Sequence, residues 1–168
     1  MYRNGHYGVN LLLYAPLGAG LLVLGEPLLA VVGWALAVGL ATAPDVDHRL
    51  PLVSHRGITH TVWAALAVGL ACGAVLSLSA ESVGLFTTTE GALVGAVGGT
   101  VGILGHVAGD ALTPMGVTPF TPLSNTHYSA SLWTADNSFA NYGLLVVGVF
   151  VTSLVVVVAL QTGAAAPV

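Results

Sequence analysis

A dense group of metal-binding residue types lies between positions 45 and 60 of the chain. Two aspartates and three histidines fall within these sixteen positions, namely Asp45, Asp47, His48, His55 and His60. Carboxylate oxygen and imidazole nitrogen together suit zinc, manganese or iron better than calcium. Taken singly, a histidine at a membrane surface is usually solvated, and the two aspartates could pair with nearby arginines. Together, in a chain with so few charges, the five residues predict a site for one or two divalent metal ions.

A second pair of candidate ligands lies further along the chain. His106 and Asp110 are four residues apart, so they face the same side of a helix. Both lie at the edge of an apolar segment, where ionisable groups are costly and usually mark function. The alternative is a structural hydrogen bond between the two side chains. His6 precedes the first apolar segment and reaches the cluster if that segment packs against the fourth, whereas His127, in a loop, is the weakest candidate.

The elements that must position these residues are apolar. The chain has 168 residues, of which 55% are hydrophobic and 6% charged, and its mean hydropathy is +0.90. Soluble domains carry about 25% charged residues, so we expect a single integral membrane domain over residues 1–168 with the lipid bilayer as its partner. Three arginines without a lysine form no basic face, which excludes nucleic-acid binding. Cys72, the only cysteine, lies in an apolar run and is interpreted as a packing residue.

Five segments are apolar enough to cross a membrane or nearly so. A spanning helix needs roughly 20 apolar residues, with about 17 as the lower limit. The candidates are residues 9–24, 27–43, 61–78, 91–112 and 142–160. We therefore predict an all-α, polytopic transmembrane helix bundle of about five spanning helices, with the metal site at one membrane face. The alternative for the first segment is a signal peptide, which fits less well because the chain stays apolar after it.

The fourth segment carries a regular series of glycines. They alternate at steps of four and three residues, at Gly91, Gly95, Gly98, Gly102, Gly105 and Gly109. This spacing keeps all six on one stripe of a helix, and glycine stripes allow close approach of helix backbones in membranes. We expect this helix at the centre of the bundle, and its stripe also offers a surface for homo-oligomer formation. The alternative is low-complexity glycine without a packing role.

The charged residues sort to opposite sides of a five-span topology. The N-terminus and the loops after the second and fourth spans lie on one side, and they carry Arg3, Arg49 and Arg56 with all six histidines. Glu26, Glu81 and Glu90 fall on the other side. The positive-inside rule makes the arginine side cytoplasmic. We therefore expect a multi-pass cell-membrane protein whose metal site faces the cytoplasm.

The loop from residue 113 to 141 lies on the same side as the metal-binding residues. It is rich in Pro, Ser, Thr and aromatic residues, and Pro114, Pro119 and Pro122 break any helix. We interpret it as a re-entrant or surface cap over the site, and an ordinary interfacial loop is the alternative.

Three motifs resemble those of a known family. They are Pro-Asp-Val-Asp-His at 44–48, His-Arg-Gly-Ile-Thr-His-Thr at 55–61, and His106-x-x-x-Asp110-x-x-Thr113-Pro114-x-Gly116. In this order they resemble the small membrane-bound metal-dependent hydrolases, also called the LexA-binding, inner-membrane-associated hydrolase family. The resemblance covers residues 6 to about 122, and His6 matches the leading histidine of that family. The His-Arg-Gly-x-Thr-His motif is its most specific part.

The chain departs from the family pattern at two places. Thr61 stands where serine is common, which keeps the hydroxyl. The family often has an acidic residue in an Asn-x-x-Glu context before its last helix, but here Asn137 is followed by Ala140 and Asn141. An acidic ligand from this region is therefore in doubt unless Asp136 substitutes. The resemblance implies a fold and a metal site more directly than it implies a reaction.

The residues and the resemblance together predict a membrane-bound, metal-dependent hydrolase. Its expected substrate is a phosphate or ester group of a lipid or other amphiphile. The candidate metal ligands are His6, Asp45, Asp47, His55, His60, His106 and Asp110. His48 is the candidate general acid or base, and Arg56 could hold a phosphate or carboxylate. The alternatives are a metal-ion transporter, which would place its ligands near the midplane, and a scaffold or regulator in which metal only staples loops.

Overall fold

Five long helices and two short 3₁₀ helices build the protein, in a computed structural model that describes residues 1–49 and 55–164. They are α1 (Arg3–Val23), α2 (Pro27–Gly39), η1 (Pro44–Arg49), η2 (Ile58–His60), α3 (Val62–Val83), α4 (Thr88–Ala111) and α5 (Ser138–Ala164). Five helical stretches are long and apolar enough to cross a membrane, and the second of them combines α2, the turn after it and η1. The predicted all-α bundle of about five spanning helices is confirmed.

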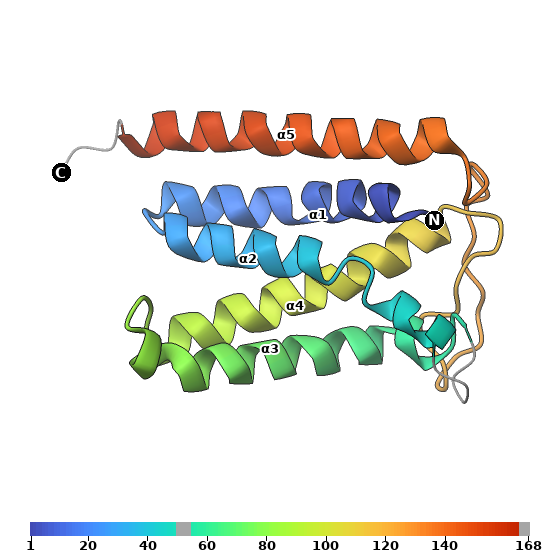
Figure 1. Cartoon of the computed structure of the whole chain (residues 1–168), viewed down its shortest axis with the longest axis horizontal. Coiled ribbons are helices and arrows are strands. Elements are labelled where there is room, and N and C mark those ends of the chain that lie inside the picture. The colour runs from blue at the N-terminus through green and yellow to red at the C-terminus, as the bar shows by residue number, and fades with distance from the viewer. Residues whose placement is uncertain (50–54, 165–168) are drawn as a thin grey trace.

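The helices lie side by side along the long axis of the molecule (Figure 1). Helix α5 packs on α1, and α3 packs on α4 at the other side of the bundle. Helix α4 runs obliquely to the other helices and contacts α1, α2 and α3, so it connects the two pairs (Figure 1). It is therefore the central helix, as its glycine content predicts.

Polar residues at the helix ends extend four helices beyond their expected bounds. Helix α1 begins at Arg3 rather than near Val9, so His6 lies inside its first turns instead of before the helix. Helix α4 begins with a capping box, in which the side chains of Thr87 and Glu90 each accept from the backbone N–H of the other residue. A run of apolar residues does not indicate such ends, because the residues that cap a helix are polar.

Helix α2 of the second span is shorter than the predicted segment of residues 27–43. Helix α2 ends at Gly39, and after a turn the chain forms η1 from Pro44 onward. Asp45 and Asp47 are thus carried by a short 3₁₀ helix at the end of the bundle. Thr61 then caps α3, where its side chain accepts from the backbone N–H of Ala64.

Glycines of α4 permit close contact with three different helices. A Cβ at Gly95 would lie 2.6 Å from the carbonyl oxygen of Cys72 in α3, and one at Gly102 would lie 2.8 Å from the Cβ of Leu40, just after α2. A Cβ at Gly109 would lie 2.9 Å from Nδ1 of His6 in α1. The stripe is therefore used inside one chain, and homo-oligomer formation through it remains a prediction.

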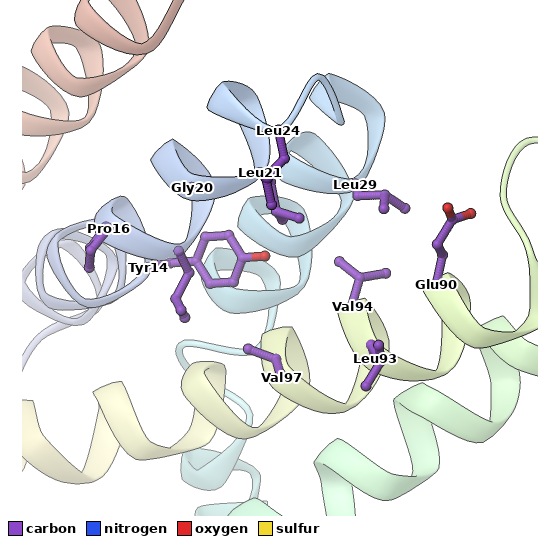
Figure 2. A pocket seen from close by; sticks show the side chains of 11 residues that line it. Tyr14, Pro16, Gly20, Leu21, Leu24, Leu29, Glu90, Leu93, Val94 and Val97 are labelled. Atoms are coloured by element: carbon purple, nitrogen blue, oxygen red, sulfur yellow. The ribbon is translucent and has the colours of Figure 1, made fainter. Parts of the chain in front are cut away.

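The two ends of the bundle differ in character. The N-terminus, η1, η2 and the loop between α4 and α5 gather at one end (Figure 1). Toward the other end, an apolar cavity of ≈ 370 Å³ lies between α1, α2 and α4. Figure 2 shows its lining, which includes leucines and valines together with Tyr14 and Glu90. The candidate metal ligands all come from segments at the first end.

Candidate metal centre

Three buried donor atoms form a small triangle where η2 meets the end of α4. Nε2 of His60 lies 3.0 Å from Nε2 of His106. Oδ2 of Asp110 lies 3.5 Å from the first nitrogen and 3.6 Å from the second. All three side chains are almost completely shielded from solvent. Donors about 2.1 Å from one ion at tetrahedral angles would be about 3.4 Å apart, so the triangle has the size of one face of a metal coordination shell.

The other ring nitrogen of His106 is fixed by the backbone. Nδ1 of His106 donates to the carbonyl oxygen of Ala41 at 2.8 Å. Because a carbonyl only accepts, this bond places the ring proton on Nδ1 and leaves a lone pair on Nε2 of the neutral ring. Hydrogen bonds of this kind orient histidine ligands in metal proteins.

His60 is oriented in the same way by a threonine and an aspartate. The hydroxyl of Thr59 donates to Oδ2 of Asp47 at 2.8 Å, so its oxygen can accept from Nδ1 of His60 at 3.0 Å. Oδ2 of Asp47 also lies 3.4 Å from this nitrogen. His60 therefore also directs the lone pair of Nε2 toward His106. Two lone pairs facing each other across 3.0 Å repel unless a proton or a metal ion lies between them.

The charge environment of His60 favours a cation at this place. Burial alone lowers the pKa of His60, but hydrogen bonding to Asp110 and Asp45 and the charge of Asp47 outweigh it, so the pKa is raised above 6.5. In the metal-free protein the proton on His60 is therefore held more firmly than on a free histidine. A divalent ion at Nε2 would take the place of that proton.

Asp45 extends the triangle toward solvent. Its Oδ1 lies 3.5 Å from Nε2 of His106 and 3.8 Å from Nε2 of His60. The side chain is one-third exposed, at 34%, whereas the other three are buried. Asp45 also belongs to a second, outer group with Asp47, His48 and His55, whose potential ligand atoms lie within 4.8 Å of one another. The Asp45 carboxylate therefore lies between the buried triangle and the outer group.

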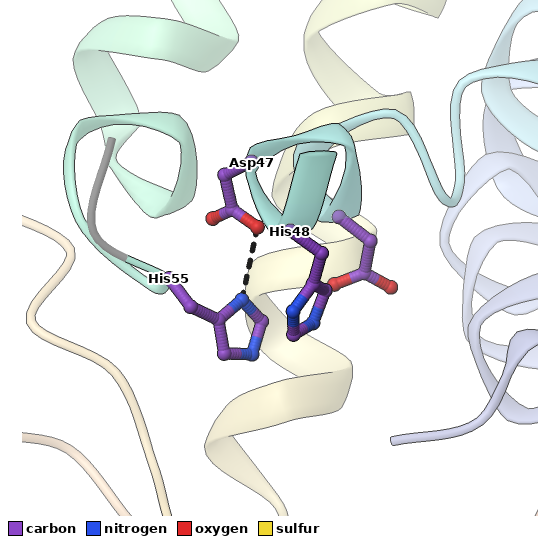
Figure 3. A group of neighbouring side chains, drawn as sticks. Asp47, His48 and His55 are labelled. Atoms are coloured by element: carbon purple, nitrogen blue, oxygen red, sulfur yellow. Dashed lines mark hydrogen bonds and ion pairs between the residues drawn. The ribbon is translucent and has the colours of Figure 1, made fainter. Parts of the chain in front are cut away.

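Asp47 is heavily engaged in positioning its neighbours. Figure 3 shows its bond with His55, whose Nδ1 lies 2.9 Å from Oδ1. Its Oδ2 accepts from Thr59 and from the backbone N–H of Arg56. The ring of His48 stacks at a tilt on that of His55, with centroids 3.7 Å apart. Asp47 thus faces the Nδ1 side of His60, behind the triangle, and faces the outer group with its other oxygen.

His6 lies against the triangle from the side of α1. Its ring stacks on that of His106 with centroids 3.8 Å apart and an interplanar angle of 10°. Nε2 of His6 donates to the carbonyl oxygen of Met1 at 3.0 Å, and Nδ1 is buried without a partner among the described residues. With Asp45 and His106 it forms a third group of potential ligands. The close approach of His6 to α4 is possible because Gly109 has no side chain.

Arg56 links the site to the loop between α4 and α5. Its guanidinium donates through Nη1 to the carbonyl oxygen of Gly116 at 2.7 Å and pairs through Nη2 with Oδ1 of Asp110 at 3.0 Å. The amino group of Met1 contacts the same carboxylate oxygen. The backbone of Arg56 has a φ of 59°, which is uncommon for a residue with a side chain and occurs at functional sites. Arg56 pairs with Asp110 rather than with Asp45 or Asp47.

The loop over residues 112–137 covers this end of the bundle (Figure 1). Val117 and Tyr128 pair as an isolated antiparallel bridge, and the backbone N–H of Val62 donates to the carbonyl oxygen of Pro119. Met115 and Ala135 from this loop help to line a cavity that also contains Asp45, Asp110 and Arg56. The loop therefore lies at the site, as expected of a cap.

A comparison with protein families decides where the chain belongs. The model of the YdjM inner membrane protein family matches residues 1–166. The chain belongs to this family. No curated protein and no solved structure matches it.

Membership in the YdjM family supports the membrane part of the resemblance seen in the sequence. With five apolar helices, it makes this chain a multi-pass membrane protein. The family description covers an inner membrane protein and includes neither LexA binding nor hydrolysis.

The structure of this YdjM family member brings all seven predicted ligands together. His6, Asp45, Asp47, His55, His60, His106 and Asp110 all belong to one or more of the three adjoining groups, and His48 joins the outer one. His127 and Asp136 are exposed and lie outside these groups. Nε2 of His127 donates instead to the carbonyl oxygen of Met115.

Sequence reasoning did not identify two supporting residues. The hydroxyl of Thr59 bridges Oδ2 of Asp47 and Nδ1 of His60 by hydrogen bonds. Only the position of Thr59 next to His60 could have indicated this role. Asn141 is buried, accepts from the backbone N–H of Tyr2 and donates to the carbonyl oxygen of Ala135. It ties the start of α1 to the start of α5.

We predict that metal affinity in this protein depends on pH through His60. A metal ion must displace the proton from Nε2, and the raised pKa of His60 keeps that proton bound at higher pH than in a free histidine. Affinity should therefore rise about tenfold per pH unit below the pKa of His60 and level off above it. Titration of the detergent-purified protein with Mn²⁺ from about pH 5 to about pH 8 measures the profile.

The exposed His127 offers a matched control. His127→Ala should keep the slope of the wild type, whereas His60→Ala should weaken binding at every pH and flatten the profile. A pH-independent affinity in the wild type would contradict the placement of the metal at Nε2 of His60.

Proposed function

We propose that this YdjM family member is a membrane-bound, metal-dependent hydrolase that acts on a phosphate or ester group of a membrane-associated substrate. The observation that carries the proposal is the triangle of His60, His106 and Asp110. Each histidine has its Nδ1 engaged by a fixed partner, so that Nε2 is directed inward. This is how proteins prepare imidazole ligands for a metal ion.

The donor set suits a catalytic metal rather than a closed structural one. Two imidazoles and one carboxylate leave coordination positions open, as in catalytic centres. Nitrogen and oxygen donors favour zinc, manganese or iron, and the outer group that shares Asp45 offers room for a second ion. A divalent ion there would supply Lewis-acid activation of water and of a phosphoryl or acyl oxygen.

The surrounding side chains have the types needed for hydrolysis. A cavity of ≈ 330 Å³ reaches the site and is lined by Asp45, Asp110, His48 and Arg56, among others. His48 is exposed and borders this cavity, so it can exchange protons with solvent as a general acid or base. Arg56 is held beside Asp110 by Gly116 and can bind an anionic group of the substrate.

The second candidate function is a membrane scaffold in which a metal only staples the loops. It is favoured by the origin of the ligands, since α1, η1, η2 and α4 each contribute to the cluster. A metal transporter has less support, because the segments that carry the ligands, η1 and η2 with the first turns of α1 and the end of α4, lie at one end of the bundle (Figure 1). Measurement of hydrolysis separates the first two functions.

We expect the metal-loaded wild type to hydrolyse a lipid phosphate or ester, and His106→Ala to lose both the metal and at least about 100-fold in rate. Metal content after purification and turnover of phosphatidic acid, p-nitrophenyl phosphate and p-nitrophenyl butyrate provide the measurements. His127→Ala is the control and should match the wild type. Metal binding without turnover of any substrate would favour the scaffold, and hydrolysis that survives metal removal would refute the proposal.

We also propose that the metal centre faces the cytoplasm. Arg3 and Arg56 line one cavity, and Glu81 and Glu90 line another near the opposite end of the bundle. This distribution agrees with the positive-inside rule. Reporter fusions in the loop of residues 112–137 should show cytoplasmic activity, and fusions after Glu26 should show activity outside. Equal reporter location at both positions would contradict the five-span arrangement.

A further inference from the structure

The cavity at the metal centre is lined by two arginines from different elements. Arg3 lies at the start of α1, and Arg56 lies in the segment before η2. Arg3 is exposed and has no ion-pair partner among the described residues. Arg56 is mostly buried, and its Nε has no partner in the described part of the chain. Both guanidiniums therefore keep hydrogen-bond donors available for a ligand.

The charge balance of the cavity predicts the charge of that ligand. Arg3 and Arg56 cancel the charges of Asp45 and Asp110, and the amino group of Met1 offsets that of Asp47, which contacts His55 of the cavity lining. A divalent ion held by the aspartates and histidines would leave a net charge of about +2. A phosphomonoester carries about −1.5 to −2 at pH 7. A neutral ester would leave all of this charge uncompensated, and a monoanionic carboxylate would leave about half of it.

The rim of the cavity suits an amphiphile. Tyr2 and Met115 line it and are both more than half exposed, at 58% and 65%. Leu123 and Leu132 of the same loop are also exposed. Apolar side chains around a charged interior allow a hydrocarbon chain to stay in the membrane while the phosphate enters the cavity.

We propose that the cavity binds a phosphomonoester dianion, with Arg3 as a specificity-determining residue that acts together with Arg56. The inference rests on the proposed metal-dependent hydrolase and names the substrate class of its site. The phosphate can belong to a membrane lipid or to a soluble molecule, since the recognised group is the same.

Arg49 provides a matched control for Arg3. Both arginines are exposed and lie on the same side of the predicted topology, but Arg49 does not line the cavity. Replacement of either by glutamine removes one positive charge from that side. Only the loss of Arg3 should change recognition of a phosphate within the cavity.

The test measures orthophosphate binding to the full-length, Mn²⁺-loaded protein by calorimetry, with acetate for comparison. The wild type should bind orthophosphate more tightly than acetate. Arg3→Gln should weaken orthophosphate binding about fivefold, as expected for an exposed charge pair, while Arg49→Gln should leave it unchanged. Arg3→Lys should recover part of the loss. Metal content, measured on the same samples, should be equal in all variants.

A competition experiment identifies the source of the phosphate. Phosphatidic acid in mixed micelles and glycerol 3-phosphate present the same group with and without acyl chains. Displacement of orthophosphate by either supports the proposal, and stronger displacement by phosphatidic acid assigns a lipid substrate. Displacement by neither overturns it.

The remaining outcomes separate the two proposals. Absence of Mn²⁺ binding would refute the metal centre and with it this inference. Normal Mn²⁺ binding with equal affinity for orthophosphate and acetate would overturn the inference alone. Equal losses in Arg3→Gln and Arg49→Gln would also overturn it, because they would assign the effect to general surface charge.

Discussion

Two imidazole nitrogens face each other across 3.0 Å in the interior of this protein, and much of the structure maintains that distance. The carbonyl oxygen of Ala41 fixes His106, and Thr59 with Asp47 fixes His60. A lone pair on each Nε2 is stable there only if a cation is shared between them. The nearby carboxylate of Asp110 strengthens the same preference. The site thus favours a bound positive charge even without a substrate.

Close helix packing makes this arrangement possible. Helix α4 carries His106 and Asp110 and contacts α1, α2 and α3 through its glycine-rich faces. Without a side chain at Gly109, the ring of His6 can lie against α4 and stack on His106. In a membrane, where apolar burial gives little preference for one helix contact over another, such close packing is a main source of specific association.

The sequence predicted the helix number, the central helix and the end of the bundle that carries the candidate site. Those features depend on apolar length, glycine spacing and the sorting of charges, which can all be read along the chain. It did not predict that α1 begins at Arg3, or that Thr59 connects Asp47 to His60. Polar helix ends do not stand out in a search for apolar runs, and hydrogen bonds behind a ligand depend on three-dimensional placement. The grouping of Asp45 with His6 and His106 as well as with the outer residues likewise required coordinates.

X-ray absorption at the metal edge of the purified, metal-loaded protein tests the central claim most directly. The scattering pattern of imidazole reports how many histidines bind the ion. The structure predicts at least two imidazoles, from His60 and His106, with oxygen donors completing a shell at about 2.0–2.2 Å. A shell of oxygen donors without imidazole, or one containing sulfur from Cys72, would contradict the account.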